Sequence, residues 1–438
     1  MKGTVHYEVK DGVAILTVDN PPVNPLSDGV RAGLVDNIKK AEDDSDIIGV
    51  VLTGAGRSFI AGADISEFGK SPDGPGLDEA FKSLEFCSKP VVAAINGSAL
   101  GGGLETALVC NYRIAGPAAF VGLPEVNLGL LPGAGGTQRL PRLVGPAEAL
   151  KMMLTGMHVN AKKALDMGII DEISDDLIND SVNFVKKVSS ESGDHPKVRD
   201  LNEKVLEARG SENILLEAKA MAAKSRKGQF APGQIIKCVE AAINLDDFDE
   251  GMKKESDYFI ECLVNPQREA MIHIFFGERA ASKIADVPRE TPIKDIKKAG
   301  IIGSGTMGGG IAMCFANAGI PVHIIDQDED NLKRGVSVIE KNYQFMVDRG
   351  RMNLEMKEGV FGLISSSLDY NDVADCDIVI EAVYENLDLK EQIFKTLDEV
   401  VKDDAILASN TSGLNVDSIA AVTKRPELVV GTHFFSPA

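Results

Sequence analysis

The stretch of sequence that decides the fold is Asn96-Gly97-Ser98-Ala99-Leu100-Gly101-Gly102-Gly103-Leu104-Glu105. It follows an apolar run at residues 91–95 that is typical of a buried strand, and a helical pattern continues from residue 106. A strand that enters a helix through consecutive glycines exposes backbone N–H groups beside the positive end of that helix. Such a turn suits a carbonyl oxygen that gains negative charge, and Glu105 is expected in the first turn of the helix.

A second carboxylate and further small residues accompany this turn. Glu125 ends the short run Gly122-Leu123-Pro124-Glu125, and a glycine-rich loop at residues 129–140 leads into another predicted helix. Upstream, residues 59–65 combine a strand tip with small side chains, which let a ligand approach the backbone. We interpret the two glutamates and the glycine turn as one active site.

The composition narrows the classes of function. The chain has 438 residues, enough for two or three domains, and its formal net charge of −20 argues against binding to nucleic acid or anionic membranes. No apolar run is long enough to span a bilayer. The six cysteines contain no Cys-x-x-Cys pair, so we expect neither a metal site nor a disulfide framework. These features favour a cytoplasmic protein.

The pattern of predicted elements divides the chain into three parts. Apolar strands alternate with helices over residues 1–190, which predicts an α/β domain. Residues 191–289 are predicted to be a helical extension and linker, because they are rich in Glu, Lys and Ala and end near Pro288 and Pro292. A new α/β unit is expected over residues 290–438.

This last part opens with a dinucleotide-binding pattern. The glycines Gly303, Gly305 and Gly308, with Met307 between the last two, follow an apolar strand and open a helix. The next strand ends at Asp326, which comes 23 residues after Gly303 and is close to the usual separation in a Rossmann unit. The glycines allow a pyrophosphate to meet the helix N-terminus, and an acidic side chain can bind the ribose hydroxyls. The sequence therefore predicts a site for NAD rather than NADP.

Four motifs of the first part carry a family resemblance. The runs at residues 59–64, 101–105, 123–125 and 132–137 occur in an order and spacing that resembles the enoyl-CoA hydratase/isomerase (crotonase) family. The resemblance implies a β/β/α spiral fold and a coenzyme A thioester substrate. It also implies that the backbone N–H groups of Ala63 and Gly102 hold the thioester oxygen, with Ala61 and Asp64 in the same substrate-binding loop.

The same resemblance implies roles for the two carboxylates. Glu105 would mainly activate water and Glu125 would mainly transfer the proton at C2 of a trans-2-enoyl-CoA. The pair could also move a proton between C2 and C4, which is Δ3–Δ2 enoyl-CoA isomerase activity. Candidate counter-charges for the phosphates of coenzyme A are Arg57, Lys70 and Lys89, although lone basic residues are more often solvated surface groups.

Three motifs of the last part resemble the 3-hydroxyacyl-CoA dehydrogenase family, at residues 378–386, 409–412 and 431–435. By this resemblance His433 is the general base, since a histidine can take the hydroxyl proton near neutral pH. The residues implied on the nicotinamide and substrate side are Val383, Glu385, Lys390 and Ser412.

The combination resembles the multifunctional fatty-acid β-oxidation enzymes. The printed sequence ends at Ala438, shortly after His433, so we expect an incomplete Rossmann domain that binds NAD weakly and oxidises 3-hydroxyacyl-CoA poorly. The alternative is a non-catalytic acyl-CoA- and NAD-binding fragment. A thiolase subunit or self-association is left open as a partner, and a peroxisomal location remains the alternative if a signal lies beyond the last residue.

Overall fold

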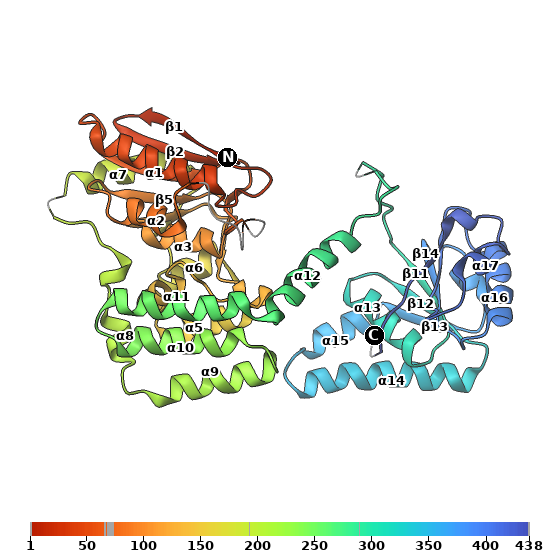
Figure 1. Cartoon of the computed structure of the whole chain (residues 1–438). Helices are drawn as coiled ribbons and strands as arrows, with labels where there is room; N and C mark the ends of the chain where they lie inside the picture. The colour runs from red at the N-terminus through yellow and green to blue at the C-terminus, as the bar shows by residue number, and fades with distance from the viewer. Residues whose placement is uncertain (1, 65–66, 68–73, 192, 289, 437–438) are drawn as a thin grey trace. The chain divides into compact units, whose positions relative to one another are not determined.

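The computed structural model of the protein describes residues 2–64, 67, 74–191, 193–288 and 290–436 (Figure 1). The chain forms two compact units, Met1–Ala285 and Asp286–Ala438, and each is described by itself below. Both units combine parallel sheets with helices, so the predicted α/β class is confirmed. Within these described ranges, none of the helices is both long and apolar enough to cross a membrane.

The first unit is built on two sheets that the chain visits in turn. Strand pairs β3/β4, β5/β6 and β7/β8 each contribute one strand to either sheet before a helix follows, which is the expected β/β/α spiral. The larger sheet has the order β1 (Thr4–Lys10), β2 (Val13–Asp19), β3 (Gly49–Gly54), β5 (Val91–Ile95), β7 (Tyr112–Ala115), β10 (Glu172–Ile173). The smaller sheet has the order β4 (Ser58–Ile60), β6 (Ser98–Leu100), β8 (Phe120–Gly122), β9 (His158–Asn160).

Helices cover both faces of the larger sheet. Every residue of β5 is buried, because Val91, Ala93 and Ile95 join the main core while Val92 and Ala94 pack with residues of α7. The helices of this unit up to α7 are α1 (Asp28–Asp43), α2 (Leu77–Glu85), α3 (Gly102–Val109), α4 (Gly136–Val144), α5 (Pro146–Thr155), α6 (Ala161–Met167) and α7 (Leu177–Ser189), with a 3₁₀ turn η2 (Glu125–Leu128).

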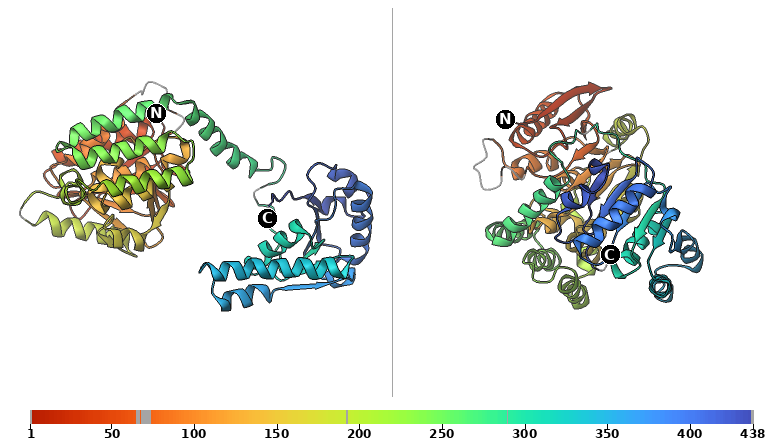
Figure 2. Two further views of the ribbon diagram at one scale, coloured as in Figure 1. Left: turned by 90° about the horizontal axis from the view of Figure 1, so that it is seen from below. Right: turned by 90° about the vertical axis from the view of Figure 1, so that its right-hand side faces the viewer.

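The helical extension also belongs to the first unit. Helices α9, α10 and α11 lie side by side, in green in Figures 1 and 2, and Cys238 and Cys262 bury their side chains in the main core. The helix α12 has no buried residue. The three-part division at residues 190 and 289 stays a prediction. The elements are η3 (Val198–Asp200), α8 (Glu203–Glu207), α9 (Glu212–Ser225), α10 (Ala231–Asn244), α11 (Phe248–Val264) and α12 (Pro266–Ala281).

The second unit is one parallel six-stranded sheet with helices on both faces. Its order β13-β12-β11-β14-β15-β16 is the 3-2-1-4-5-6 order of a Rossmann fold. Neighbouring residues of β11 face opposite layers, since Ile301 packs with α13 and α14 while Ile302 packs with α16. The strands are β11 (Ala299–Ile302), β12 (Val322–Ile325), β13 (Ile364–Ser367), β14 (Ile378–Glu381), β15 (Ile406–Ser409) and β16 (Val429–Gly431). The helices are α13 (Thr306–Asn317), α14 (Glu329–Asp348), α15 (Leu354–Phe361), α16 (Leu387–Val400) and α17 (Val416–Ala420), with 3₁₀ turns η4 (Tyr370–Val373) and η5 (Pro426–Leu428).

Candidate active sites

The glycine turn between β6 and α3 brings two backbone amides together. Gly101 has φ +55°, a left-handed conformation that favours glycine, and Gly102 is the first residue of α3. A Cβ atom added to Gly102 would lie 3.2 Å from the nitrogen of Ala63, and a β-bridge to Leu26 holds Ala63 there. Neither the Ala63 nor the Gly102 amide donates a hydrogen bond within the described ranges. The two N–H groups are therefore available to one ligand oxygen.

Glu105 lies in the first turn of α3 and is only 3% exposed. Its Oε1 atom accepts hydrogen bonds of 2.8 Å from the backbone amides of Ala134 and Gly136. Burial raises the pKa of Glu105, and these two amides together with the charge of Arg139 oppose that rise. Amide donors stabilise the ionised form of a carboxyl group, so they offset part of the cost of burying a charge on Glu105.

Glu125 opens the turn η2 and has a different environment. Its Oε2 atom is buried and has no hydrogen-bond partner among the described residues. Burial raises the pKa of Glu125 well above its ordinary value, and the charges of Glu105 and Glu255 raise it further. Its Oε1 atom lies 3.0 Å from the position of a Cβ on Gly101, which places the carboxyl group beside the glycine turn. Its environment thus favours the protonated form more strongly than that of Glu105 does.

The structure describes most of the other residues predicted for substrate binding and for the coenzyme A phosphates. Ala61 donates a backbone hydrogen bond of 3.1 Å to Val23, and Asp64 follows Ala63 directly in the same loop. Lys89 donates to two backbone carbonyls at the end of α1, so it supports that helix. Arg57 is exposed, and Lys70 lies outside the described residues.

A third glutamate was missed by the sequence reasoning. Glu255 of α11 is completely buried and binds the same loop that binds Glu105, through the amides of Gly135 and Thr137. It comes from a helix with many charged residues, and nothing in the local sequence distinguishes it from its solvated neighbours.

In the second unit, the glycines let the backbone approach a ligand closely. Gly303 has φ +107°, and a Cβ there would lie 2.7 Å from the carbonyl oxygen of Ala382. A Cβ on Gly308 would lie 1.8 Å from the carbonyl oxygen of Gly303, so α13 packs directly on the turn. Gly305 is the N-cap of α13, and no atom lies within 4 Å of its Cβ position. The helix N-terminus is therefore open to a pyrophosphate.

Asp326 lies directly after β12, beside this turn. Its Oδ2 atom accepts hydrogen bonds from the amide of Ser304 at 2.9 Å and from the Ser304 hydroxyl at 2.6 Å. Met307 is half-buried in the first turn of α13. An acidic side chain at this strand end fits a ribose diol, and an open glycine turn fits the pyrophosphate, so the residues present fit NAD.

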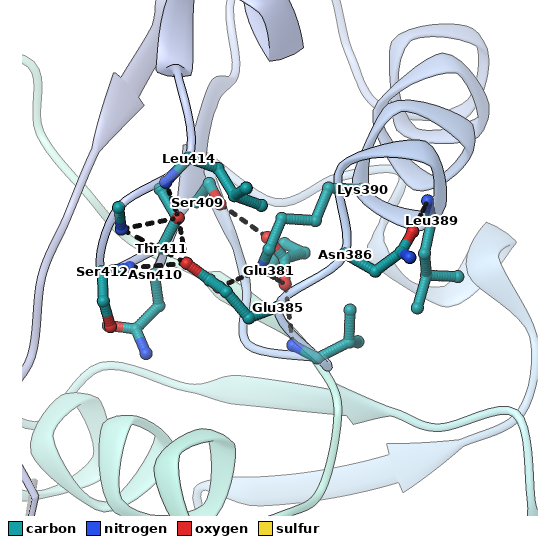
Figure 3. Close-up of polar contacts among 12 residues, drawn as sticks. Glu381, Glu385, Asn386, Leu389, Lys390, Ser409, Asn410, Thr411, Ser412 and Leu414 are labelled. Carbon is teal, nitrogen blue, oxygen red and sulfur yellow. Dashed lines mark hydrogen bonds and ion pairs between the residues drawn. The ribbon is translucent and has the colours of Figure 1, made fainter.

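A network at the ends of β14 and β15 brings three further predicted residues together (Figure 3). Glu385 accepts hydrogen bonds from the Thr411 hydroxyl at 2.5 Å and from the Ser412 amide at 2.9 Å. Burial raises the pKa of Glu385, but these hydrogen bonds and the charge of Lys390 bring it below the ordinary value. Lys390 lies 3.4 Å from Glu385 and has no exposed surface. Its positive charge therefore stabilises the ionised form of Glu385.

Glu381, which the sequence reasoning did not single out, anchors that lysine. It accepts hydrogen bonds from Lys390 at 2.6 Å, from the Val383 amide at 2.7 Å and from the Ser409 hydroxyl at 2.6 Å. The signal available in the sequence was its position at the carboxyl end of an apolar strand, next to the predicted nicotinamide side. The Glu381 carboxylate thus binds the beginning of the loop after β14, through Val383, and the last residue of β15, Ser409.

His433 follows β16 and is exposed. Its ring lies 4.7 Å from the ring of Phe435, and the next residue, Phe434, donates a backbone hydrogen bond to Asn410. In the part of the chain that the structure describes, the His433 side chain has neither a hydrogen bond nor an ion pair. The geometry places it near the loop after β15 without a carboxylate to orient it.

The fold and the two sites define a crotonase-type unit joined to a Rossmann dinucleotide-binding unit. Residues 8–230 match the family "Enoyl-CoA hydratase/isomerase", and residues 298–438 match "3-hydroxyacyl-CoA dehydrogenase, NAD binding domain". The chain belongs to the enoyl-CoA hydratase/isomerase family, and its second unit is an NAD-binding domain of the 3-hydroxyacyl-CoA dehydrogenase type.

Curated relatives match nearly the whole chain. The peroxisomal bifunctional enzymes of Cavia porcellus and Danio rerio are 37% and 39% identical, and each alignment covers 99% of this chain and 60% of the relative. The fatty acid oxidation complex subunit alpha of Shewanella sp. (strain MR-4) is 38% identical over 98% of this chain and 62% of the relative. The chain therefore spans about three-fifths of the length of these relatives.

Proposed function

We propose that the first unit hydrates trans-2-enoyl-CoA to 3-hydroxyacyl-CoA. The observation that carries this proposal is the pairing of Glu105 and Glu125 beside the free amides of Ala63 and Gly102. One carboxyl group receives two amide hydrogen bonds and favours its anion, while the other has a buried oxygen without a donor and keeps its proton. Such a pair separates the base from the acid.

These groups account for each proton that moves in the hydration reaction. The Glu105 carboxylate takes a proton from water as the oxygen attacks C3, and the electron pair of the double bond moves onto the thioester oxygen. The amides of Ala63 and Gly102 stabilise this oxyanion, an effect of about 3–4 kcal/mol for one donor in comparable sites. Glu125 gives its proton to C2, and transfer of the proton from Glu105 to Glu125 restores the site.

The experiment follows the loss of conjugated enoyl-thioester absorbance with crotonyl-CoA as substrate. Glu105→Gln and Glu125→Gln should each lower kcat by a factor of about 10² to 10⁴, as expected for loss of a general acid or base. Glu172→Gln, at an exposed position of β10, is the matched control and should keep the activity of the unaltered chain. Equal rates in all three variants would overturn the proposal. Binding of the substrate without turnover by the unaltered chain would favour the non-catalytic alternative.

The same two carboxyl groups support isomerisation of Δ3-enoyl-CoA. Glu125 lies beside the glycine turn, so once its own proton has passed to Glu105 it can remove a proton from C2 and return that proton to C4 while the amides hold the dienolate oxygen. Conversion of 3-hexenoyl-CoA to its trans-2 isomer should need Glu125 more than Glu105, because no water has to be activated. An equal loss in both variants would contradict this assignment.

In the second unit, bound NAD would supply the oxidant for the 3-hydroxyl group. The glycine turn at residues 303–308 and Asp326 would hold it, and Glu385 and Ser412 would border its nicotinamide side. His433 would accept the hydroxyl proton, but it lacks a hydrogen-bonded carboxylate among the described residues, so its tautomer is not fixed. We therefore expect the chain of 438 residues to bind NAD and to form NADH slowly from 3-hydroxybutyryl-CoA. Rapid NADH formation would contradict this expectation.

The names of the relatives bear on the partners and on the location of this chain. The bacterial relative is described as a subunit of a fatty acid oxidation complex, and we propose that this chain also associates with another subunit such as a thiolase, or with itself. The relatives include peroxisomal proteins and a bacterial one, so the cytoplasmic location stays a prediction with the peroxisome as its alternative.

A further inference from the structure

The start of α4 is shared between two carboxyl groups that come from distant parts of the chain. Four successive amides, at residues 134–137, point alternately to Glu105 of α3 and to Glu255 of α11. The N···O distances to Glu105 are 2.8 Å from Ala134 and Gly136, and those to Glu255 are 2.6 Å from Gly135 and 3.1 Å from Thr137. Because the two sets of amides alternate along one loop, a movement of the loop away from one carboxyl group disturbs the hydrogen bonds of both.

The loop is built for this double binding. Gly135 has φ +99°, and a Cβ there would lie 1.8 Å from Nη1 of Arg139, so only glycine gives this turn its shape. The hydroxyl of Thr137 adds a hydrogen bond of 2.5 Å to Glu255, which has no exposed surface. A buried carboxyl group that receives three donors from one turn fixes the position of that turn.

The groups around Glu255 give little stabilisation to a negative charge on this buried carboxyl group. The groups that face it are Glu105 of α3, Glu125 of η2, Arg139 of α4 and the Cys238 thiol of α10. Arg139 is already paired with Glu85, through hydrogen bonds of 2.9 and 2.8 Å. Burial and the charge of Glu105 raise the pKa of Glu255 to about 8. The Glu255 carboxyl group therefore holds its proton more tightly than an ordinary glutamate does.

We infer that Glu255 is a positioning residue for the hydration reaction, which holds the amides at residues 134–137 in the arrangement that Glu105 requires. This inference rests on the proposed hydratase function. Glu255 binds the amides of Gly135 and Thr137, so it acts through the loop whose neighbouring amides bind Glu105. A displaced loop affects the turnover step more than the affinity for the thioester.

The test is the pH dependence of kcat and KM for crotonyl-CoA in the full chain. Glu255→Gln keeps the size of the side chain and an acceptor for the Gly135 amide but removes the charge. We expect kcat to fall by about 10- to 100-fold, as displaced catalytic groups usually cause, with KM nearly unchanged. In the unaltered chain, ionisation of Glu255 near pH 8 adds a negative charge beside the pair and raises the pKa values of Glu105 and Glu125, so kcat should change in this range. This change should be absent from Glu255→Gln and present in Glu255→Asp, which keeps a titrating carboxyl group.

The control is Glu250→Gln, an exposed position on the same helix, which should leave kcat and the pH profile unchanged. A lower thermal midpoint for Glu255→Gln together with an unchanged kcat and pH profile would overturn the inference, because only a structural role would remain. If Glu255→Gln does not fold, an unchanged kcat in Glu255→Asp, whose shorter side chain withdraws the carboxyl group from the loop, would overturn it as well. Retained activity of Glu105→Gln would instead overturn the hydratase proposal, so the two failures are distinguishable.

Discussion

Lys390 donates a hydrogen bond of 2.6 Å to Glu381, and neither side chain is exposed to solvent. The pair joins the end of β14 to the first turn of α16. Glu385 lies in the loop between these two elements, 3.4 Å from Lys390. A buried ion pair depends on both partners, because a single buried charge loses its hydration without compensation. The pair therefore links the stability of the second unit to the shape of the loop that we propose borders the nicotinamide.

The first prediction concerns this pair. Lys390→Met leaves the Glu381 carboxylate buried with only neutral donors, which should lower the free energy of unfolding of the second unit by about 3–5 kcal/mol. Denaturant unfolding of the full chain measures this value. The control Lys395→Met lies on an exposed position of the same helix and should change stability by less than about 0.5 kcal/mol. Adding Glu381→Leu to Lys390→Met should recover part of the loss, and no recovery would contradict the ion-pair explanation.

The second prediction concerns the glycine turn. Gly101→Ala introduces a Cβ 3.0 Å from Oε1 of Glu125 at φ +55°, so both the turn and the carboxyl group must shift. A displacement of catalytic groups by about 1 Å commonly lowers kcat about 100-fold, and we expect a loss of that size for crotonyl-CoA hydration. Gly116→Ala is the matched control, because its Cβ makes only an ordinary contact of 3.8 Å. Similar rates for both variants would show that the turn has no role in positioning Glu125.

The elements that the sequence predicted well are those determined by local pattern. The apolar run at residues 91–95 is a buried strand, Glu105 lies in the first turn of the following helix, and residues 303–305 form the turn between β11 and α13. Glycine patterns of this kind report a local backbone requirement, so they can be seen without knowledge of the tertiary fold.

The features that the sequence did not predict depend on contacts between segments that are distant in the sequence. Glu255 meets Gly135 across 120 residues of sequence, and its helix otherwise has the charge pattern of a solvated surface. Lys390 was placed on the nicotinamide side by family resemblance, but its burial depends on Glu381 and on the packing of α16 against the sheet. Hydrophobic periodicity identifies buried apolar faces and gives no signal for a buried charge that is paired.

The third prediction concerns the binding of NAD. Gly308→Ala places a Cβ 1.8 Å from the carbonyl oxygen of Gly303, which forces α13 away from the turn that would receive the pyrophosphate. We expect NADH binding, measured by its fluorescence, to weaken by at least about tenfold, or about 1.4 kcal/mol. Gly359→Ala on α15 is the control, since no atom lies within 4 Å of its added Cβ. Equal affinity in both variants would contradict the assignment of the glycine turn to the dinucleotide.

The last prediction is a pH dependence of stability that originates in Glu255. The pKa of this carboxyl group rises from 4.5 to about 8 in the folded chain, so between these values the folded state holds more protons than the unfolded state. Stability must therefore decrease as the pH rises through this window, by at most about 1.4 kcal/mol per pH unit for one group. Glu255→Gln removes the titrating group, and the difference in unfolding free energy between this variant and the unaltered chain should change steadily between about pH 5 and pH 8. Denaturant unfolding at several pH values measures it, with Glu250→Gln as the control. A difference that stays constant over this range would show that Glu255 does not change its protonation there.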